Sequence, residues 1–383
     1  NTNILSRNIF LIFFFIVVFE GAIRKWLIPN SELFIVSFRD LIVLFCIHYA
    51  FKNKIFKFNN KFENLILLWT FLVILWILLQ LIFTKLSYQI ALIGIRNWVL
   101  YLWLTLFFFK TLSENDLNFI FKIIIITIIP ISILSITQHL SPPEHFLNKQ
   151  TDENVYLVLE GIVRTTGTFS FNSGYSYYLM FVCPLIYVTF IGEIYNKLSY
   201  LFILTIFLAF MLAVATSGSR LSISYSIVML VPFLICLFTK KEKKNQIILL
   251  IIISSISVLV ADKFFSKAID TTLKRYELAS KNVTMKQRVI ESNFGTIEAW
   301  SNFSIIGDGI GKGSNPARIF LNSYERNFIF GETETIKILN EGGVLGIIFI
   351  LGKFFLIYFL YKAYKLKKIY SYSLPLLYWC YLF

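Results

Sequence analysis

Long apolar runs separated by short polar stretches dominate the chain. Four of the runs, Leu65–Phe83, Leu117–Thr137, Leu198–Ala215 and Gly343–Tyr361, approach the ~20 residues that a helix needs to cross a bilayer core. With the shorter runs included, the pattern predicts about eleven membrane helices. They are expected at Ile9–Ala22, Leu33–Phe51, Leu65–Phe83, Ile90–Phe109, Leu117–Thr137, Asn172–Ile191, Leu198–Ala215, Leu221–Phe238, Gln246–Ala261, Glu332–Tyr361 and Ser371–Phe383.

Composition agrees with this pattern, because 57% of the residues are hydrophobic and only 15% are charged. Soluble domains are typically about 45–50% apolar. The sequence therefore predicts an all-α, polytopic membrane protein with a long extracytoplasmic loop that contains amphipathic helices. The expected parts are N-terminal membrane helices in 1–137, an outer loop in 138–171, central membrane helices in 172–261, a long outer loop in 262–331 and C-terminal membrane helices in 332–383.

The lysine-rich segments predict the orientation of these helices. If the spans alternate from a cytoplasmic N-terminus, KNKIFKFNNK, KKEKK and KAYKLKK all fall on the cytoplasmic side, where positive residues are retained. The net charge of +14 is then mostly a topology signal, although the lysines would also suit anionic lipid headgroups. The lysines form no surface interleaved with aromatic residues, so nucleic-acid binding is a poor interpretation.

Arginine is distributed differently from lysine in the same arrangement. Arg7 is the only arginine on the inner side, and the others lie outside or at outer helix ends. They are Arg24, Arg39, Arg96, Arg164, Arg220, Arg275, Arg288, Arg318 and Arg326. The planar guanidinium binds phosphate oxygens two at a time and stays charged, so the outer arginines favour an anionic, pyrophosphate-bearing ligand.

Local ion pairs are the alternative role for these arginines. Glu20 and Arg24, like Arg288 and Glu291, have a spacing at which side chains meet on a helix. Arg39 adjoins Asp40. Arg164 and Arg220 have no acidic residue within three positions, so pairing explains them less well.

The long segment before the last helices contains two further patterns. In RVIESNFGTIEAWSNF, Ile290, Phe294, Ile297 and Trp300 recur at near-helical spacing, which predicts an amphipathic helix on the outer surface. The next stretch, SIIGDGIGKGSNP, is too rich in glycine for a helix and indicates a turn where backbone segments pass closely. A phosphate-binding P-loop is excluded, because Gly311 and Lys312 precede Gly313 instead of serine or threonine.

Four motifs, taken in order, carry a resemblance to a known family. They are RTTGTF at the outer mouth of one helix, TSGSR at the end of another, Arg288 followed by IIGDGIG, and LNEGGVLG in a late helix. Their order and spacing resemble the O-antigen ligase and polymerase superfamily. The resemblance covers about Arg164 to Gly346. It implies a glycosyltransferase on the outer face of a bacterial inner membrane that takes a glycan from an undecaprenyl pyrophosphate carrier.

The resemblance also assigns residues. It implies that Arg164, Arg220 and Arg288 bind the donor pyrophosphate, and the outer arginines Arg96 and Arg39 are possible additions. The ligases carry a histidine at the head of the helix that holds the E-x-G motif, and that position falls at or near Glu332 here. None of the three histidines lies there. This departure favours a polymerase, which joins lipid-linked repeat units, over a ligase, which transfers the glycan to lipid A core.

The proton acceptor in such a reaction would be a carboxylate. Glu332 and Glu334 are the candidates, because the attacking hydroxyl must lose its proton. Helical geometry puts Glu334 on one face with Lys337 and Glu341, which favours Glu332 as the free acid if the helix already includes it. The E-x-E spacing is alternatively suited to a divalent ion. The cysteines show no ligand spacing, so no metal site and no cofactor is expected.

The sequence thus favours a polymerase of lipid-linked oligosaccharide repeat units. Its expected partners are an undecaprenyl-pyrophosphate-linked oligosaccharide donor, a glycan acceptor, membrane lipids and a chain-length regulator protein. A ligase is the near alternative. A transporter or flippase for lipid-linked oligosaccharides would use the same arginines, but transporters tend to place such sites near the middle of the membrane.

Overall fold

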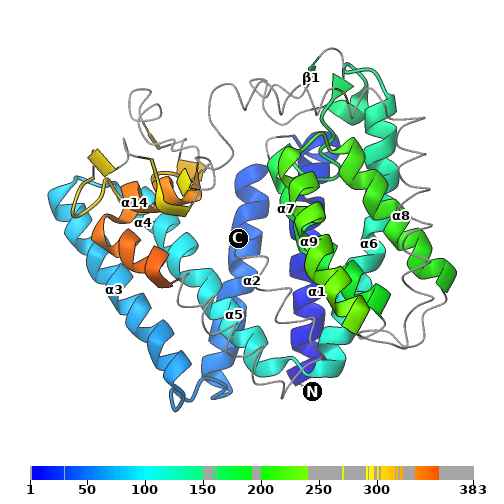
Figure 1. Cartoon of the computed structure of the whole chain (residues 1–383). Coiled ribbons are helices and arrows are strands. Elements are labelled where there is room, and N and C mark those ends of the chain that lie inside the picture. The colour runs from blue at the N-terminus through cyan, green and yellow to red at the C-terminus, as the bar shows by residue number, and fades with distance from the viewer. Residues whose placement is uncertain are drawn as a thin grey trace. The chain divides into compact units, whose positions relative to one another are not determined.

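The computed structural model describes residues 2–29, 31–149, 158–159, 162–191, 200–239 and 333–352, and short stretches between 270 and 321. The chain divides into two compact units. Figure 1 shows its helices and strands coloured by residue number. Unit 1 comprises Asn1–Phe10, Leu33–Leu112 and Asn282–Leu356, and unit 2 comprises Leu11–Glu32, Ser113–Lys281 and Ile357–Phe383. The described residues are mainly helical, and they include one very short β-hairpin.

The described part of unit 1 includes α2 (Glu32–Lys52), α3 (Lys61–Phe83), α4 (Tyr88–Ile95), α5 (Tyr101–Thr111) and α14 (Glu334–Gly342). A π-helical turn, η2 (Arg96–Leu100), joins α4 to α5. Side-chain caps fix several helix starts: Asn60 accepts a hydrogen bond from Phe62 N at α3, and Ser87 does the same for Ile90 N at α4.

Unit 2 contains most of α1 (Thr2–Ala22), which continues into the π-helical turn η1 (Ile23–Leu27). Its other helices are α6 (Glu114–Leu140), the short η3 (Phe146–Asn148), α7 (Asn172–Ile191), α8 (Tyr200–Thr216) and α9 (Arg220–Thr239). Strands β1 (Val158–Leu159) and β2 (Ile162–Val163) form the antiparallel hairpin. Helix α6 packs mainly against α8, and α7 packs mainly against α9.

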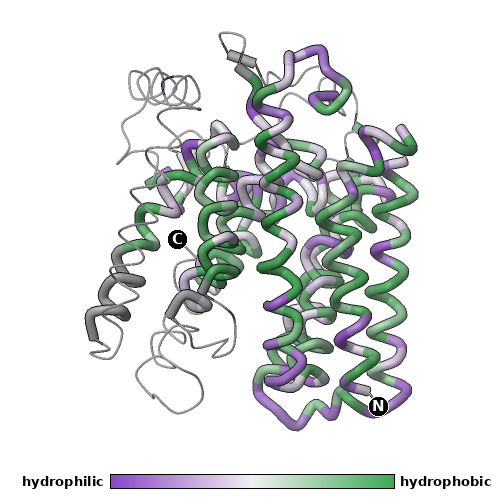
Figure 2. The backbone as a smooth tube through the Cα atoms, turned by 90° about the vertical axis from the view of Figure 1, so that its right-hand side faces the viewer, coloured by the Kyte–Doolittle hydropathy of each residue, from purple (hydrophilic) through white to green (hydrophobic). Residues whose placement is uncertain are grey.

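Five stretches of the described residues are long and apolar enough to cross a membrane. They are Thr2–Leu27, Glu32–Lys52, Lys61–Phe83, Tyr88–Thr111 and Glu114–Leu140. The tube in Figure 2 is mostly hydrophobic along the helices, with hydrophilic residues at many helix ends and loops. Many apolar side chains of α2 and α3 are exposed, among them Leu41, Phe71 and Ile82. Hydrocarbon in place of water would remove the free-energy penalty of exposing them.

The predicted spans before residue 240 are confirmed as helices, with ends shifted by a few residues. The first one begins earlier than predicted, at Thr2 instead of Ile9, because a helical backbone accommodates the polar residues Arg7 and Asn8. Pro130 and Pro184 lie inside α6 and α7 without ending them. The predicted spans Gln246–Ala261 and Ser371–Phe383 lie outside the described residues.

Two predicted continuous helices are interrupted, each at a glycine. The span predicted over Glu332–Tyr361 breaks after α14 at Gly343, whose φ of 53° favours glycine, and helix resumes at 344. The amphipathic helix predicted around Ile290 is broken at Gly295, with φ of 84°, before Trp300. Side-chain periodicity predicted helix in both places, but it does not detect a backbone reversal imposed by packing.

Candidate anion-binding site

The loop of residues 165–170, called here the threonine–glycine loop, links the β-hairpin to α7 in unit 2. Thr165, Thr166 and Thr168 are buried in it. The Oγ of Ser135, in α6, lies 2.6 Å from Thr165 Oγ1 and 2.9 Å from Thr216 Oγ1, at the end of α8. Thr165 Oγ1 also donates to the Thr216 carbonyl at 3.1 Å. These bonds bring the RTTGTF and TSGSR motifs together.

Asn172, the first residue of α7, joins the same two motifs through its side-chain amide. Its Nδ2 donates to the carbonyl oxygen of Thr165 at 2.8 Å and to that of Ser217 at 2.9 Å. The end of α8 and the starts of α7 and α9 therefore meet at one end of unit 2. Successive helices among α7, α8 and α9 therefore run in opposite directions.

Gln138, near the end of α6, supports the threonine–glycine loop from a buried position. Its Oε1 accepts hydrogen bonds from the backbone N–H groups of Thr166 at 3.3 Å and Gly167 at 2.8 Å, and its Nε2 donates to Gly167 O at 3.2 Å. Gly167 has φ of 53°, and a Cβ there would lie 3.3 Å from Ile131 and 3.4 Å from Tyr175. The loop conformation thus depends on glycine at this position.

Residues at the end of α1 and in η1 also form hydrogen bonds with the threonine–glycine loop. Lys25 Nζ donates to Thr166 Oγ1 and to Gly167 O, both at 2.9 Å, and Thr168 Oγ1 donates to Val18 O at 2.7 Å. Arg24 donates to Ser170 Oγ at 3.2 Å. Because hydrogen bonds from α1, α6 and α7 fix the loop, it forms a rigid base for the residue that precedes it, Arg164.

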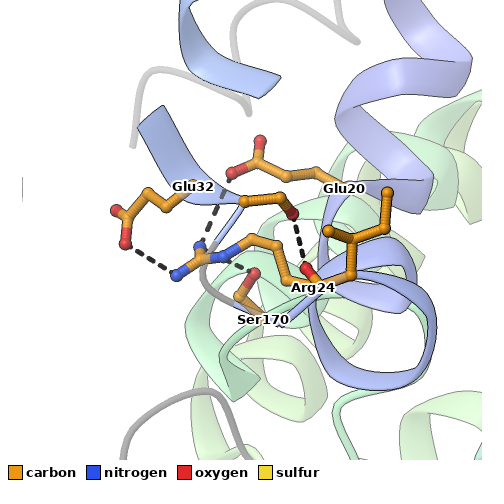
Figure 3. Close-up of polar contacts among 6 residues, drawn as sticks. Glu20, Arg24, Glu32 and Ser170 are labelled. Carbon is orange, nitrogen blue, oxygen red and sulfur yellow. Dashed lines mark hydrogen bonds and ion pairs between the residues drawn. The ribbon is translucent and has the colours of Figure 1, made fainter. Parts of the chain in front are cut away.

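Arg24 is an ion-paired residue in this arrangement. Its guanidinium lies 3.6 Å from Glu20 Oε1 and 2.7 Å from Glu32 Oε2, and the same side chain contacts Ser170 (Figure 3). The local pairing of Glu20 with Arg24 that their helical spacing indicated is therefore confirmed. The partnership with Glu32, at the start of α2, adds a second carboxylate.

The charges of Arg164 and Arg220 interact, although 56 positions separate the two residues in the sequence. Burial lowers the pKa of the Arg164 guanidinium, and the positive charge of Arg220 lowers that pKa further. Arginine nevertheless stays protonated at any physiological pH. The buried Nε of Arg164 has no hydrogen-bond acceptor among the described residues. Two neighbouring guanidinium groups, one of them with an unused donor, favour the binding of an anion.

The remaining predicted site residues have different positions. Arg288 and Glu332 lie outside the described residues. Arg96, the first residue of η2, has its Nε 3.2 Å from Asp40 Oδ1, and Tyr101 donates to the same oxygen at 3.1 Å. Arg39 lies in α2 beside Asp40. Arg96 is therefore ion-paired within unit 1.

Glu334 is the exposed first residue of α14, and Thr333 is the N-cap. The comparison of helical faces that included Glu332 stays a prediction, because Glu332 lies outside the described residues. Glu334 and Glu341 also differ in environment, since Glu341 is buried. The described residues contain no cluster of three His, Cys, Asp or Glu side chains suited to a metal ion.

The glycine-rich loop, residues 304–314 of unit 1, is held by backbone contacts, as the sequence predicted. Gln80 Nε2 donates to Ile306 O at 2.7 Å and to Glu341 O at 2.8 Å, and its Oε1 accepts from Ile310 N at 2.8 Å. A Cβ on Gly311, whose φ is 100°, would lie 2.5 Å from Ile90 O. The glycines thus permit the loop backbone to touch the α4 backbone.

The carboxylate of the E-x-G motif, Glu341, is part of this packing. Its Oε2 accepts from Trp98 Nε1 at 2.9 Å, and its Oε1 accepts from Gly313 N at 2.8 Å. Asp308 N donates to Asn340 O at 2.7 Å. Burial raises the pKa of the Asp308 carboxyl, and the charge of Lys312 opposes that rise. The motif LNEGGVLG therefore anchors a loop in unit 1.

Sequence reasoning missed Lys25, Ser135, Gln138 and Gln80 as parts of these sites. A usable signal existed, because polar residues inside an apolar span are costly and are often functional or hydrogen-bonded. Comparisons with protein-family models, curated proteins and solved structures found no match for the chain. The assignment of function therefore depends on the geometry described above and on the resemblance of the motifs.

Proposed function

We propose that the protein is a membrane glycosyltransferase of the polymerase type, which elongates a surface polysaccharide at the outer face of a bacterial inner membrane. The observation that carries this proposal is the meeting of RTTGTF and TSGSR through buried hydroxyl groups, which lets the charge of Arg220 act on Arg164. These motifs resemble the O-antigen ligase and polymerase superfamily. From that resemblance we infer that the anion is the pyrophosphate of a polyprenyl-linked glycan donor.

The arginines stabilise the leaving group in this reaction. The oxygen of an acceptor hydroxyl bonds to the anomeric carbon of the donor glycan, and the bond from that carbon to the pyrophosphate oxygen breaks. The pyrophosphate keeps the bonding electron pair, so negative charge grows on it. Preorganised guanidinium donors in a site with little water stabilise that charge strongly. Arg164 and Arg220 fill this role, and Arg288 is assigned to it from the resemblance.

The proton of the acceptor hydroxyl passes to a carboxylate. We assign this role to Glu332, where the ligases carry a histidine, and keep Glu334 as the second candidate. Replacing Glu332 by glutamine removes proton acceptance but keeps hydrogen bonding, so turnover should fall by roughly 10²-fold while donor binding is kept. Near-normal turnover would exclude Glu332 as the base. Loss of activity with a chelator would instead indicate that Glu332 and Glu334 share a metal ion.

Two other functions use the same anion site. A ligase would transfer the glycan to lipid A core, and a flippase would move the lipid-linked oligosaccharide without breaking a bond. Arg164 follows β2 in the segment before α7, and Arg220 begins α9, so neither lies in the middle of a described helix. This position favours an enzyme over a transporter whose site lies near the middle of the membrane. The missing ligase histidine favours the polymerase over the ligase.

The decisive experiment replaces Arg164 and Arg220 by lysine, one at a time, in purified enzyme supplied with lipid-linked repeat units. Lysine keeps the charge but loses the planar, two-donor geometry, so polymer formation should fall by about 10²-fold. Arg7→Lys, in the first turns of α1, is the control and should keep normal polymer ladders. Normal ladders from both site variants would refute the proposal. Product formed only with lipid A core as acceptor would identify a ligase.

The outward orientation has its own test. In a cysteine-free background, Ser173→Cys, at the exposed start of α7, should react with an impermeant thiol reagent in spheroplasts. Asn53→Cys, exposed at the end of α2, should react only after the membrane is opened. The reverse labelling pattern would place the arginines on the cytoplasmic side and contradict the proposed location of the reaction.

A further inference from the structure

Lys25, in the π-helical turn η1, is the most deeply buried lysine of the described residues. Its exposed fraction is 1%. The ammonium donates to Thr166 Oγ1 and Gly167 O, both at 2.9 Å, and lies 4.9 Å from the centre of the Trp26 ring. All of these partners are uncharged. An isolated charge buried in this way is very unfavourable unless something compensates for it.

Several other cations in the described residues have carboxylate partners. Arg24, adjacent to Lys25, contacts Glu20 and Glu32. In unit 1, Arg96 contacts Asp40, and Lys110 forms an ion pair with the buried Glu63. Lys25 has no such carboxylate among the described residues, although Arg24 beside it has two. Two adjacent cations therefore differ in their surroundings. Carboxylates neutralise the charge of Arg24, whereas no described carboxylate neutralises that of Lys25.

Lys25 bonds to the same loop that follows Arg164 of the anion site. Thr166 and Gly167, which it contacts, follow Arg164 by two and three residues in the same loop. The Nε of Arg164 also has no acceptor among the described residues. Positive charge therefore accumulates at one loop from two elements, η1 and the end of the β-hairpin. A bound anion would neutralise both groups at once.

We propose that Lys25 is a positioning residue of the anion site, and that a phosphate group of a bound lipid supplies the negative charge that Lys25 and Arg164 lack. Lys25 acts through the threonine–glycine loop, because its ammonium is buried against Thr166 and Gly167. Its positive charge raises the affinity of the loop for phosphate, and its hydrogen bonds fix the backbone that follows Arg164. π-Helical turns are rare and are frequent at functional sites, which agrees with this role.

The proposal rests on the proposed function only for the identity of the lipid, which is the pyrophosphate-bearing donor. Binding of four probes to the full chain in detergent separates the sources of phosphate: undecaprenyl pyrophosphate, undecaprenyl monophosphate, phosphatidylglycerol and inorganic pyrophosphate. The variants are Lys25→Arg, Lys25→Gln and Lys25→Met. Thr168→Val is the matched control, because it removes a hydrogen bond between the same loop and α1 without changing the charge.

Undecaprenyl pyrophosphate should bind best, and Lys25→Gln and Lys25→Met should each weaken it about tenfold or more, as loss of a charged interaction requires. Lys25→Arg should keep most of the affinity, and Thr168→Val should lose much less than Lys25→Gln. The affinity of the two neutral variants should also depend less on salt concentration. Thermal unfolding of each variant shows that the loss is measured on folded protein.

The outcomes separate the two proposals. Equal affinities in wild type, Lys25→Gln and Lys25→Met would overturn the role of Lys25 and leave the proposed function standing. A loss in Thr168→Val as large as that in Lys25→Gln would also overturn it, since loosening of the loop would then explain both. Lys25-dependent binding of phosphatidylglycerol alone would retain the anion site but refute the pyrophosphate donor. Binding of no probe would refute both.

Discussion

Two buried glutamines, Gln80 in α3 and Gln138 in α6, hold a glycine-containing loop in similar ways. Each has both an amide donor and a carbonyl acceptor bonded to the backbone of its loop. The surroundings of the two loops differ. In unit 1 the acid Glu341 binds the glycine-rich loop through Gly313 N. In unit 2 the cation Lys25 binds the threonine–glycine loop.

The same backbone device therefore has a different electrostatic environment in each unit. The glycine-rich loop is bonded through Gln80, Glu341 and Trp76, whose Nε1 donates to Ile306 O at 2.8 Å. These contacts stabilise packing between segments far apart in sequence. The threonine–glycine loop is equally well supported, but Arg164 beside it keeps an unused buried donor. The threonine–glycine loop is therefore the better candidate for ligand binding, because Lys25 and Arg164 near it lack carboxylate partners among the described residues.

The largest expected effect comes from Gly311→Val in the glycine-rich loop. The new side chain would meet Ile90 O and Gly94 N, and valine strongly disfavours φ of 100°. We expect a loss of about 3 kcal/mol or more in the free energy of unfolding, measured by thermal unfolding in detergent. Gly174→Ala, in α7, is the control and should be tolerated, because its Cβ would have no neighbour closer than 3.5 Å. Equal stability of both variants would contradict the packing role of the loop.

Replacing each glutamine by leucine compares the two loops directly. Gln80→Leu and Gln138→Leu each leave several buried backbone groups without partners, so each should lose about 2–4 kcal/mol of stability. Among molecules that remain folded, only Gln138→Leu should also weaken the binding of undecaprenyl pyrophosphate, because its loop follows Arg164. Binding is measured below the unfolding temperature of both variants. Equal weakening by Gln80→Leu would remove the functional distinction between the loops.

The smallest effect on stability and activity is expected for Arg96→Lys. This variant compares an arginine that has a carboxylate partner with Arg164, whose Nε has no acceptor among the described residues. The side chains of Arg96 and Asp40 are 13% and 23% exposed, and lysine can still pair with Asp40. Stability should change by about 1 kcal/mol or less, and polymer formation should stay near that of the wild type. A loss as large as that of Arg164→Lys would return Arg96 to the pyrophosphate site.

The apolar runs alone predicted much of the local structure. The prediction of α7 agrees with its observed bounds, Asn172–Ile191, and α8 and α9 differ from prediction by only one or two residues at each end. The spacing of Glu20 and Arg24 also predicted an ion pair that is present. These features depend on residues within one or two helical turns, so the sequence contains the information directly. The close passage at the glycine-rich loop was predicted for the same reason, since closely spaced glycines permit it.

Only the tertiary structure decided which distant groups meet. Thr165 bonds to Thr216, Lys25 bonds to Thr166, and Asp40 pairs with Arg96, and none of these partnerships is visible in local spacing. The break at Gly343 also required it, because a Cβ there would strike the backbone of residues 304 and 305. Burial and charge compensation depend on three-dimensional neighbours. For that reason the sequence alone did not single out Lys25, whereas its neighbours in the fold make it a buried cation bonded to the loop that follows Arg164.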